Sequence, residues 1–247
     1  MKQILSFFIF FSVFGCGLSD DCIKSSGSDV TKSIEIPEGA MFDVIYVNPG
    51  ISMVLTQGEE PSISIQAGDN FIDQIKAEIT GNTLRLTDES GCNWVRDYGN
   101  TTVYVTAPNI IEIYSNTEQP IRSNGILTYP ILRLYAMDFF GGVGTNDFFI
   151  EVDNLQLVIA SSNVAGFYIT GKTNQMLLNF YDGVGRFEGA DFLAKSIKVF
   201  QRGSNDMIIH PLDSLSGDIY STGNVISKTH PAYTSVIEHY TGRLIFD

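Results

Sequence analysis

The residues that could do covalent, acid–base or metal chemistry are few in this 247-residue chain. Its three histidines, His210, His230 and His239, lie in no metal-binding spacing such as HExxH. The acidic pairs Asp20-Asp21 and Glu59-Glu60 fall in a Ser-rich segment and an expected turn, not on strand faces where two carboxylates could flank a glycosidic bond. No GxSxG nucleophile elbow is present. The sequence therefore predicts no catalytic residues, no metal site and no cofactor, and we expect a protein that is not an enzyme.

Residues 1–15 have the pattern of a bacterial lipoprotein signal peptide. The positive start Met1-Lys2 precedes an apolar run from Ile4 to Phe14, which is too short for a membrane-spanning helix of about 20 residues. The run ends in Val13-Phe14-Gly15-Cys16, which resembles a lipobox. By that resemblance Cys16 becomes the mature N-terminus and carries the lipid. The alternative is an ordinary signal peptide cleaved nearby, with Cys16 incidental.

A polar, Ser-rich stretch over residues 16–30 is expected to be a flexible tether, and residues 31–247 to be one folded domain. Ser19-Asp20-Asp21 looks like an acidic surface-export signal, so we expect an outer membrane lipoprotein on the cell surface or the periplasmic face. In that oxidising compartment the remaining cysteines, Cys22 and Cys92, are expected to form a disulfide. Such a bond would pin the end of the tether to the domain.

The chain is acidic, because 15 Lys and Arg residues against 28 Asp and Glu residues give a formal net charge of −13. Nucleic-acid binding needs a basic surface, so we expect no nucleic-acid partner. Adsorption to anionic lipid through charge is disfavoured as well, which leaves the lipid anchor as the expected contact with the membrane. The 23 Gly, 17 Phe and 11 Tyr residues suit many short strands joined by tight turns.

The C-terminal half repeats a six-residue alternating strand about every twenty residues. The repeats begin at Leu132, Leu155, Met176, Ile197, Leu215 and Ser235. A single strand cannot bury its apolar face alone, so parallel stacking of the units into an all-β solenoid is expected. A β-sandwich is the alternative. The N-terminal part is a less regular β region, with a short helix expected over Phe71–Lys76.

Strand alternation separates an interior face from an outward one. The expected interior positions are apolar in most repeats, with Gln201 and His239 as polar exceptions. The outward positions hold a row of aromatic residues with one arginine: Tyr135, Met137, Tyr181, Phe200, Arg202, Tyr220 and Tyr240. Exposed aromatics beside an arginine are typical of binding surfaces, so this row is the predicted ligand face. The alternative is that a loop, the N-terminal strands or a second subunit covers it.

Several stretches resemble the head GIN domain family of auto-transporter adhesins. They are Ser52–Gln57, Ile63–Ile79, Gly81–Leu84, Cys92–Tyr98 and Gly217–Asn224 with Pro231. The resemblance covers residues 30–247 and implies a right-handed parallel β-helix at the cell surface or in the periplasm. It implies adhesion by name only, and it carries over no catalytic residue.

The main hypothesis is a lipid-anchored envelope adhesin that binds a glycan or a protein through the aromatic row. A carbohydrate-active enzyme on a β-helix is an alternative, since some parallel β-helices cleave polysaccharides. The other is an envelope scaffold, for which a homo-oligomer that buries the row is expected.

Overall fold

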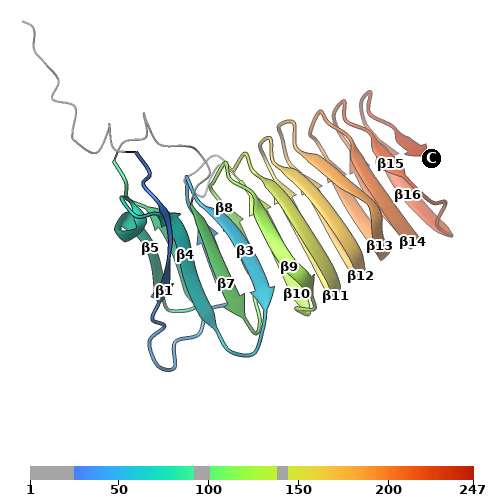
Figure 1. Ribbon diagram of the computed structural model, residues 1–247. Helices are drawn as coiled ribbons and strands as arrows, with labels where there is room; N and C mark the ends of the chain where they lie inside the picture. Colours follow the sequence, from blue (N-terminus) through green and yellow to red (C-terminus); the bar gives the residue numbers. More distant parts are fainter. Residues whose placement is uncertain (1–24, 92–100, 138–143) are drawn as a thin grey trace, which may run out of the picture.

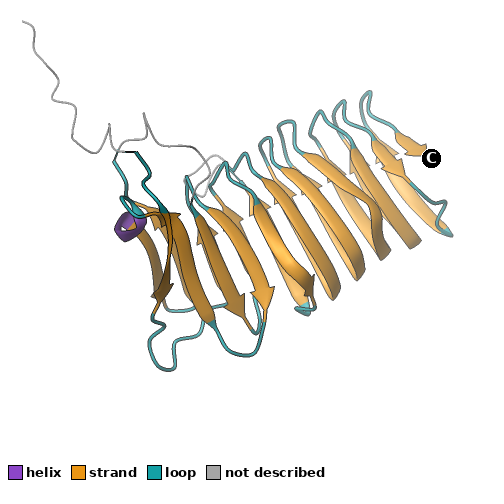
Figure 2. Cartoon of the chain, viewed as in Figure 1, coloured by secondary structure: helices purple, strands orange, loops and turns teal. Residues whose placement is uncertain are grey.

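The computed structural model describes residues 25–91, 101–137 and 144–247, and these form an elongated stack of β-strands (Figure 1). The expected all-β class is confirmed, since strands dominate these ranges and the helical content within them is one short turn toward the N-terminal end (Figure 2). All 17 strands belong to one hydrogen-bonded network. The described part contains no helix that is long and apolar enough to cross a membrane.

Strand bounds follow the chain from the N-terminal region into the repeats. The first nine strands are β1 (Asp29–Ile34), β2 (Val44–Val47), β3 (Ser52–Gln57), β4 (Ser62–Gly68), β5 (Ile75–Thr80), β6 (Thr83–Asp88), β7 (Thr102–Ala107), β8 (Glu112–Ser115) and β9 (Ile121–Leu127). The other eight are β10 (Ile131–Ala136), β11 (Asp147–Ser161), β12 (Gly166–Phe180), β13 (Arg186–Gln201), β14 (Met207–Ile219), β15 (Val225–Ser227), β16 (Tyr233–Glu238) and β17 (Leu244–Phe246).

The long strands β11 to β14 pair in parallel, each with the next along the chain. One ladder position runs from Leu157 through Met176 and Ile197 to Leu215. At either end of this block a long strand is flanked by two short ones: β11 pairs with β9 and then β10, and β14 with β15 and then β16. The repeat of about twenty residues therefore corresponds to successive parallel strands.

The N-terminal region adds antiparallel pairs to this parallel stack. Strand β4 lies between β1 and β7, antiparallel to both, and β5 forms a hairpin with β6. The helix expected over Phe71–Lys76 is only the 3-10 turn η2 (Ile72–Gln74). The prediction was too long because Ile75 and Lys76 already pair with Asp88 and Thr87 in the hairpin.

The core consists of columns of inward side chains that run along the stack. The column Phe148, Phe167, Phe187, Met207 and Val225 is fully buried, and the rings of Phe148 and Phe167 stack 4.9 Å apart. Gln201 lies in the core as expected, where its Nε2 donates to the Asn205 carbonyl oxygen and its Oε1 accepts from the Gly203 N–H. Satisfied hydrogen bonds make this buried amide tolerable.

Expected interior assignments are wrong in two of the repeats. Leu155 is 59% exposed; Leu132 pairs with Leu157, and Leu155 itself forms no ladder pairing. In the last repeat Leu215 pairs with Thr234 rather than Ser235. A slip of one residue turns every side chain of a strand to the other face, so Ser235, Ile237 and His239 point outward, and Ile237 is 57% exposed.

Several sequence predictions fall on residues outside the described ranges. The signal peptide of residues 1–15, Cys16, Cys22 and Cys92 all lie there. Of the predicted tether, residues 25–30 are described, and β1 already begins at Asp29.

Candidate functional site

The outward aromatic row is built by ladder positions near the ends of the long strands. Phe200 of β13 pairs with Asn179 of β12 and Asp218 of β14. Two residues further along each strand stand Tyr181, Arg202 and Tyr220. Backbone hydrogen bonds continue the parallel pairing to these positions, from Arg202 N–H to the Phe180 carbonyl oxygen at 2.8 Å and from Tyr220 N–H to the Gln201 carbonyl oxygen at 2.7 Å. Consecutive coils therefore present these side chains on one face.

The rings of Tyr181, Phe200 and Tyr220 are inclined to one another, and we call them the tilted row. The centroids of Tyr181 and Phe200 lie 5.5 Å apart at 46°, and those of Phe200 and Tyr220 lie 5.2 Å apart at 44°. Tyr181 is 42% exposed and Tyr220 is 41% exposed. Because inclined rings do not cover one another fully, part of the surface of Tyr181 and of Tyr220 stays open to a partner.

His239 extends the tilted row by one coil, a residue that the sequence analysis placed in the interior. Its ring stacks on Tyr220 at 4.1 Å and 5°. Its Nε2 lies 2.8 Å from Asp218 Oδ1, so the ring is hydrogen-bonded to a carboxylate on the neighbouring strand. Pairing Thr234 with Leu215 in the sequence would have placed His239 in this row.

Tyr135 belongs to a second set of rings with a different geometry, which we call the stacked ladder. Tyr46 and Tyr114 lie 4.5 Å apart at 8°, and Tyr114 and Tyr135 lie 4.6 Å apart at 14°. The Arg85 guanidinium lies over the Tyr46 ring at 4.7 Å. The ring faces are therefore occupied by each other and by a cation, which makes the ladder a stabilising element of the fold.

Sequence reasoning missed Tyr46 and Tyr114, although a signal was present. Each follows an apolar residue in a short alternating strand, and the register of β2 and β8 places the two directly opposite each other. The Tyr114 hydroxyl donates to Glu112 Oε2 at 2.7 Å. Burial and this carboxylate raise the pKa of the Tyr114 phenol well above its usual range. Glu112 also binds Arg133 at 2.9 Å, so the ladder is fixed by charged neighbours.

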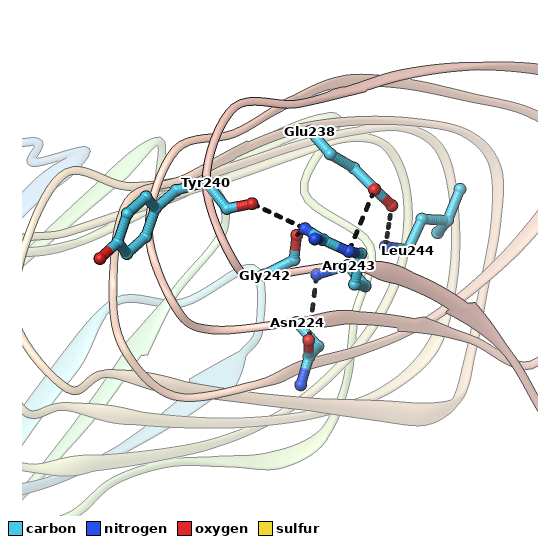
Figure 3. A network of polar contacts seen from close by, with 6 residues as sticks. All are labelled: Asn224, Glu238, Tyr240, Gly242, Arg243 and Leu244. Atoms are coloured by element: carbon cyan, nitrogen blue, oxygen red, sulfur yellow. Dashed lines mark hydrogen bonds and ion pairs between the residues drawn. The ribbon is translucent and has the colours of Figure 1, made fainter.

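The remaining predicted residues have mixed outcomes. Met137, just past the end of β10, is only 5% exposed, so it is not part of an exposed face. Arg202 is exposed at its position between Tyr181 and Tyr220. Tyr240 is 63% exposed but stands on the C-terminal turn, and the described ring contacts do not include it. In Figure 3 its ring points away from a polar network in which its carbonyl oxygen accepts from Arg243.

A surface pocket of about 450 Å³ lies beside the first residues of this face. Leu155, Leu193 and Leu212 supply its apolar lining, and Lys172 and Lys195 supply charge. Lys172 is paired with Asp153 at 3.3 Å. Strand β13 thus runs from this pocket, at Leu193 and Lys195, to the tilted row at Phe200.

Within residues 25–91, 101–137 and 144–247, no group of three or more His, Cys, Asp and Glu side chains could hold a metal ion. His239 with Asp218 is a surface acid–base pair stacked on a tyrosine. What the arrangement offers chemically is a set of ring faces with cations beside them, held on a hydrogen-bonded sheet.

A family model described as "Putative auto-transporter adhesin, head GIN domain" matches residues 41–231. The chain belongs to this family. Among solved structures, a "putative adhesin" from Bacteroides fragilis has 18% identity and a TM-score of 0.80, over 91% of this chain and 100% of that one. A "putative adhesin" from Parabacteroides merdae has 18% identity and a TM-score of 0.63, over 90% and 98%.

A "putative lipid binding protein" from Parabacteroides distasonis has 14% identity and a TM-score of 0.59, over 90% of this chain and 99% of that one. At these identities the likeness concerns the fold. No curated protein matches the chain. The sequence resemblance to the head GIN family is thus confirmed, and the family's adhesin description agrees with an envelope protein.

Proposed function

We propose that this head GIN protein is a non-catalytic binding module of the cell envelope and that the tilted row is its ligand face. The observation that carries the proposal is the inclination of about 45° between Tyr181, Phe200 and Tyr220, two of which are about two-fifths exposed on the outside of the molecule. Exposed aromatic side chains held in a rigid frame are a common basis of binding surfaces. A glycan or a protein is the expected ligand class.

Rigidity supports the choice of this face. The strands that carry the rings are flanked by parallel partners, and the core columns beneath them are fully buried. A ligand that settles on preordered rings loses less conformational entropy of the site on binding than one that must order a loop. The stacked ladder is a poorer candidate, since its ring faces are already covered.

The coil architecture we propose is a right-handed parallel β-helix, with residues 31–247 as one head GIN domain. Parallel pairing of consecutive long strands at offsets of about twenty residues supports it. So does the strong right-handed preference of parallel crossover connections in proteins. In this architecture the ligand face runs along the axis of the stack, so an extended ligand could contact several coils at once.

We further propose that residues 1–15 are a signal peptide, that Cys16 carries the lipid anchor, and that residues 16–30 are the tether. Support comes from the lipobox-like sequence and from the family's adhesin description. The anchored domain would then face the cell surface or the periplasm at the outer membrane. A Cys22–Cys92 disulfide belongs to the same proposal, since both residues would reside in an oxidising compartment.

The test is a glycan and protein binding array with the exported full chain, held in a sugar-free detergent, beside a Tyr181→Ser/Tyr220→Ser variant. The two rings are about two-fifths exposed, so the variant should remain folded with a free energy of unfolding lowered by about 1–2 kcal/mol. Binding by the parent and its loss in the folded variant would support the proposal. No binding by the parent protein on the array, or unchanged binding by the variant, would contradict the proposal.

A further inference from the structure

We infer that the ligand of the tilted row is an acidic glycan, held by Lys198 and Arg202 on either side of Phe200. The inference rests on the proposed function and specifies the ligand class for that face. It starts from the distribution of positive charge over the described part of the chain.

Most lysine and arginine side chains in the described ranges already have a partner. The ion pairs are Lys32–Asp73, Arg133–Glu112, Lys172–Asp153, Arg186–Glu188, Lys228–Asp247 and Arg243–Glu238. Arg85 and Arg122 lie over aromatic rings, and Lys76 donates to a backbone carbonyl oxygen. Within residues 25–91, 101–137 and 144–247, the side chains of Lys195, Lys198 and Arg202 make no ion pair, hydrogen bond or ring contact. All three lie on the same coil.

That coil is β13 and the residue after it, and it carries the central ring of the tilted row. Lys198, Phe200 and Arg202 are alternate residues, so their side chains leave the same face of the strand. At about 3.3 Å per residue, the Cα atoms of Lys198 and Arg202 are about 13 Å apart. The Phe200 ring lies between them and contacts Tyr181 on one side and Tyr220 on the other.

Two carboxylates lie beside the tilted row, and each accepts a hydrogen bond from a neighbouring group. Asp218 is hydrogen-bonded to His239, and Asp182 accepts from the Gly183 backbone N–H. A net charge of −13 makes uncompensated cations scarce on this molecule, and here three occur within eight residues. Two separated cations with a ring between them suit a ligand whose acid groups sit on different units and whose apolar ring faces can pack on aromatics. An oligosaccharide of uronic acids has both properties.

Lys195 lies earlier on the same strand and lines the pocket together with Leu155, Leu193 and Leu212. The separation of about 13 Å between the Cα atoms of Lys198 and Arg202 favours an oligomer over a single sugar. The long-range electrostatic interaction between an acidic polymer and a protein of net charge −13 is repulsive. Affinity should therefore depend on direct contacts at the row, and it should fall with added salt to the extent that Lys198 and Arg202 contribute.

The probes are hyaluronan oligosaccharides and oligogalacturonates, each beside the same oligomer after its carboxyl groups are reduced to hydroxymethyl groups. Calorimetry with the exported full chain in a sugar-free detergent should show binding of at least one acidic oligomer and at least tenfold weaker binding of its reduced form. Lys198→Gln and Arg202→Gln should each weaken the binding of the acidic oligomer about twofold to fivefold, as expected for exposed charge contacts. Lys76→Gln removes a charge far along the chain from the row and serves as the control, with unchanged affinity.

The outcomes separate the inference from the proposed function. Equal binding of acidic and reduced oligomers, lost on Tyr181→Ser/Tyr220→Ser, would overturn the acidic assignment and leave the tilted row as ligand face. Equal binding of poly-L-glutamate would overturn the glycan assignment, since charge alone would then be recognised. If neither acidic oligomer binds the protein and the array identifies a neutral ligand, the inference is also overturned. Failure of every probe and of the whole array would contradict the proposed function itself.

Discussion

Tyr129 is a single buried phenol whose ionisation is linked to the stability of the fold. Its hydroxyl donates to the Ala107 carbonyl oxygen at 3.0 Å, and the side chain is fully buried. Burial raises the pKa of Tyr129 well above the usual value of about 10. A folded-state pKa above the unfolded value means that this contribution is complete below about pH 10 and declines as the pH rises further.

Tyr129→Phe should therefore lower the free energy of unfolding by about 1 kcal/mol at neutral pH, through loss of one buried hydrogen bond. Between about pH 9 and 11 the parent should lose stability more steeply than the variant, so the gap between them narrows. Urea unfolding across this range measures both. A gap that stays constant with pH would show that the Tyr129 phenol is not the group that titrates.

At the scale of the strand pair, Gly217 lies where the backbones of β13 and β14 approach each other closely. Its φ is +132°, and a Cβ added there would lie 1.9 Å from the Val199 carbonyl oxygen. Gly217→Ala should lower the free energy of unfolding by about 2–4 kcal/mol, because the backbone of β13 or β14 must move. Gly91→Ala is the control, since a Cβ there meets no atom within 4 Å and φ is not positive. Thermal unfolding with equal losses for both would contradict the close approach of these strands.

Register sets the limit of what the sequence could predict about these elements. Alternation within a strand is local, so the inward placement of Leu157, Met176, Ile197 and Leu215 could be predicted from the pattern. The number of residues between paired positions of consecutive strands cannot be predicted from one strand alone. The turns differ in length, and ladder irregularities occur, for example between Glu188 and Leu193. A β-bulge of this kind changes the number of residues between successive ladder positions, while the amino-acid composition of the strand stays the same.

The same limit applies to the candidate site. Tyr181, Phe200 and Tyr220 could be found from the repeat, because the offsets between those strands followed from their pattern. His239 could not, since the last strand has little apolar alternation to fix its register, and one residue of slip reversed its face. The tilt of the rings, which separates the candidate site from the ladder, depends on side-chain packing between coils and leaves no trace in the sequence.

At the scale of the whole molecule, the last strands of the stack carry a polar network around Glu238 and Arg243. Glu238 occupies the ladder position after Ile219, in a column that is inward in earlier coils. Its carboxylate accepts from the Leu244 N–H at 2.8 Å and lies 3.5 Å from Arg243, which also contacts the carbonyl oxygens of Tyr240 and Gly242 (Figure 3). Terminal repeats with a polar outer surface keep stacked folds soluble.

Glu238→Leu should remove this polar network and expose an apolar end, so the variant should self-associate more than the parent. Sedimentation velocity measures this self-association, and Glu78→Leu on the N-terminal hairpin is a charge-matched control. A faster-sedimenting species specific to Glu238→Leu is expected. Identical sedimentation of Glu238→Leu and the parent would show that Glu238 does not protect the end of the stack.

Attachment to the membrane is a property of the whole chain that Cys16 is proposed to confer. In cells labelled with palmitate, the parent should incorporate label and fractionate with membranes, and Cys16→Ser should do neither. Cys92→Ser keeps the proposed lipid site and controls for loss of a cysteine. Label retained in Cys16→Ser, or a parent without label, would refute lipidation at this position.

The measurement that tests the central claim most directly is the affinity of one array-selected ligand for three folded proteins: the parent, Tyr181→Ser/Tyr220→Ser, and Tyr46→Ser in the stacked ladder. If the tilted row is the ligand face, the double variant should bind at least tenfold more weakly, as expected when aromatic anchors are truncated. The ladder variant should stay within about threefold of the parent, because its ring faces are already covered. Equal affinities for the parent and the double variant, or a loss confined to Tyr46→Ser, would contradict the assignment of the tilted row.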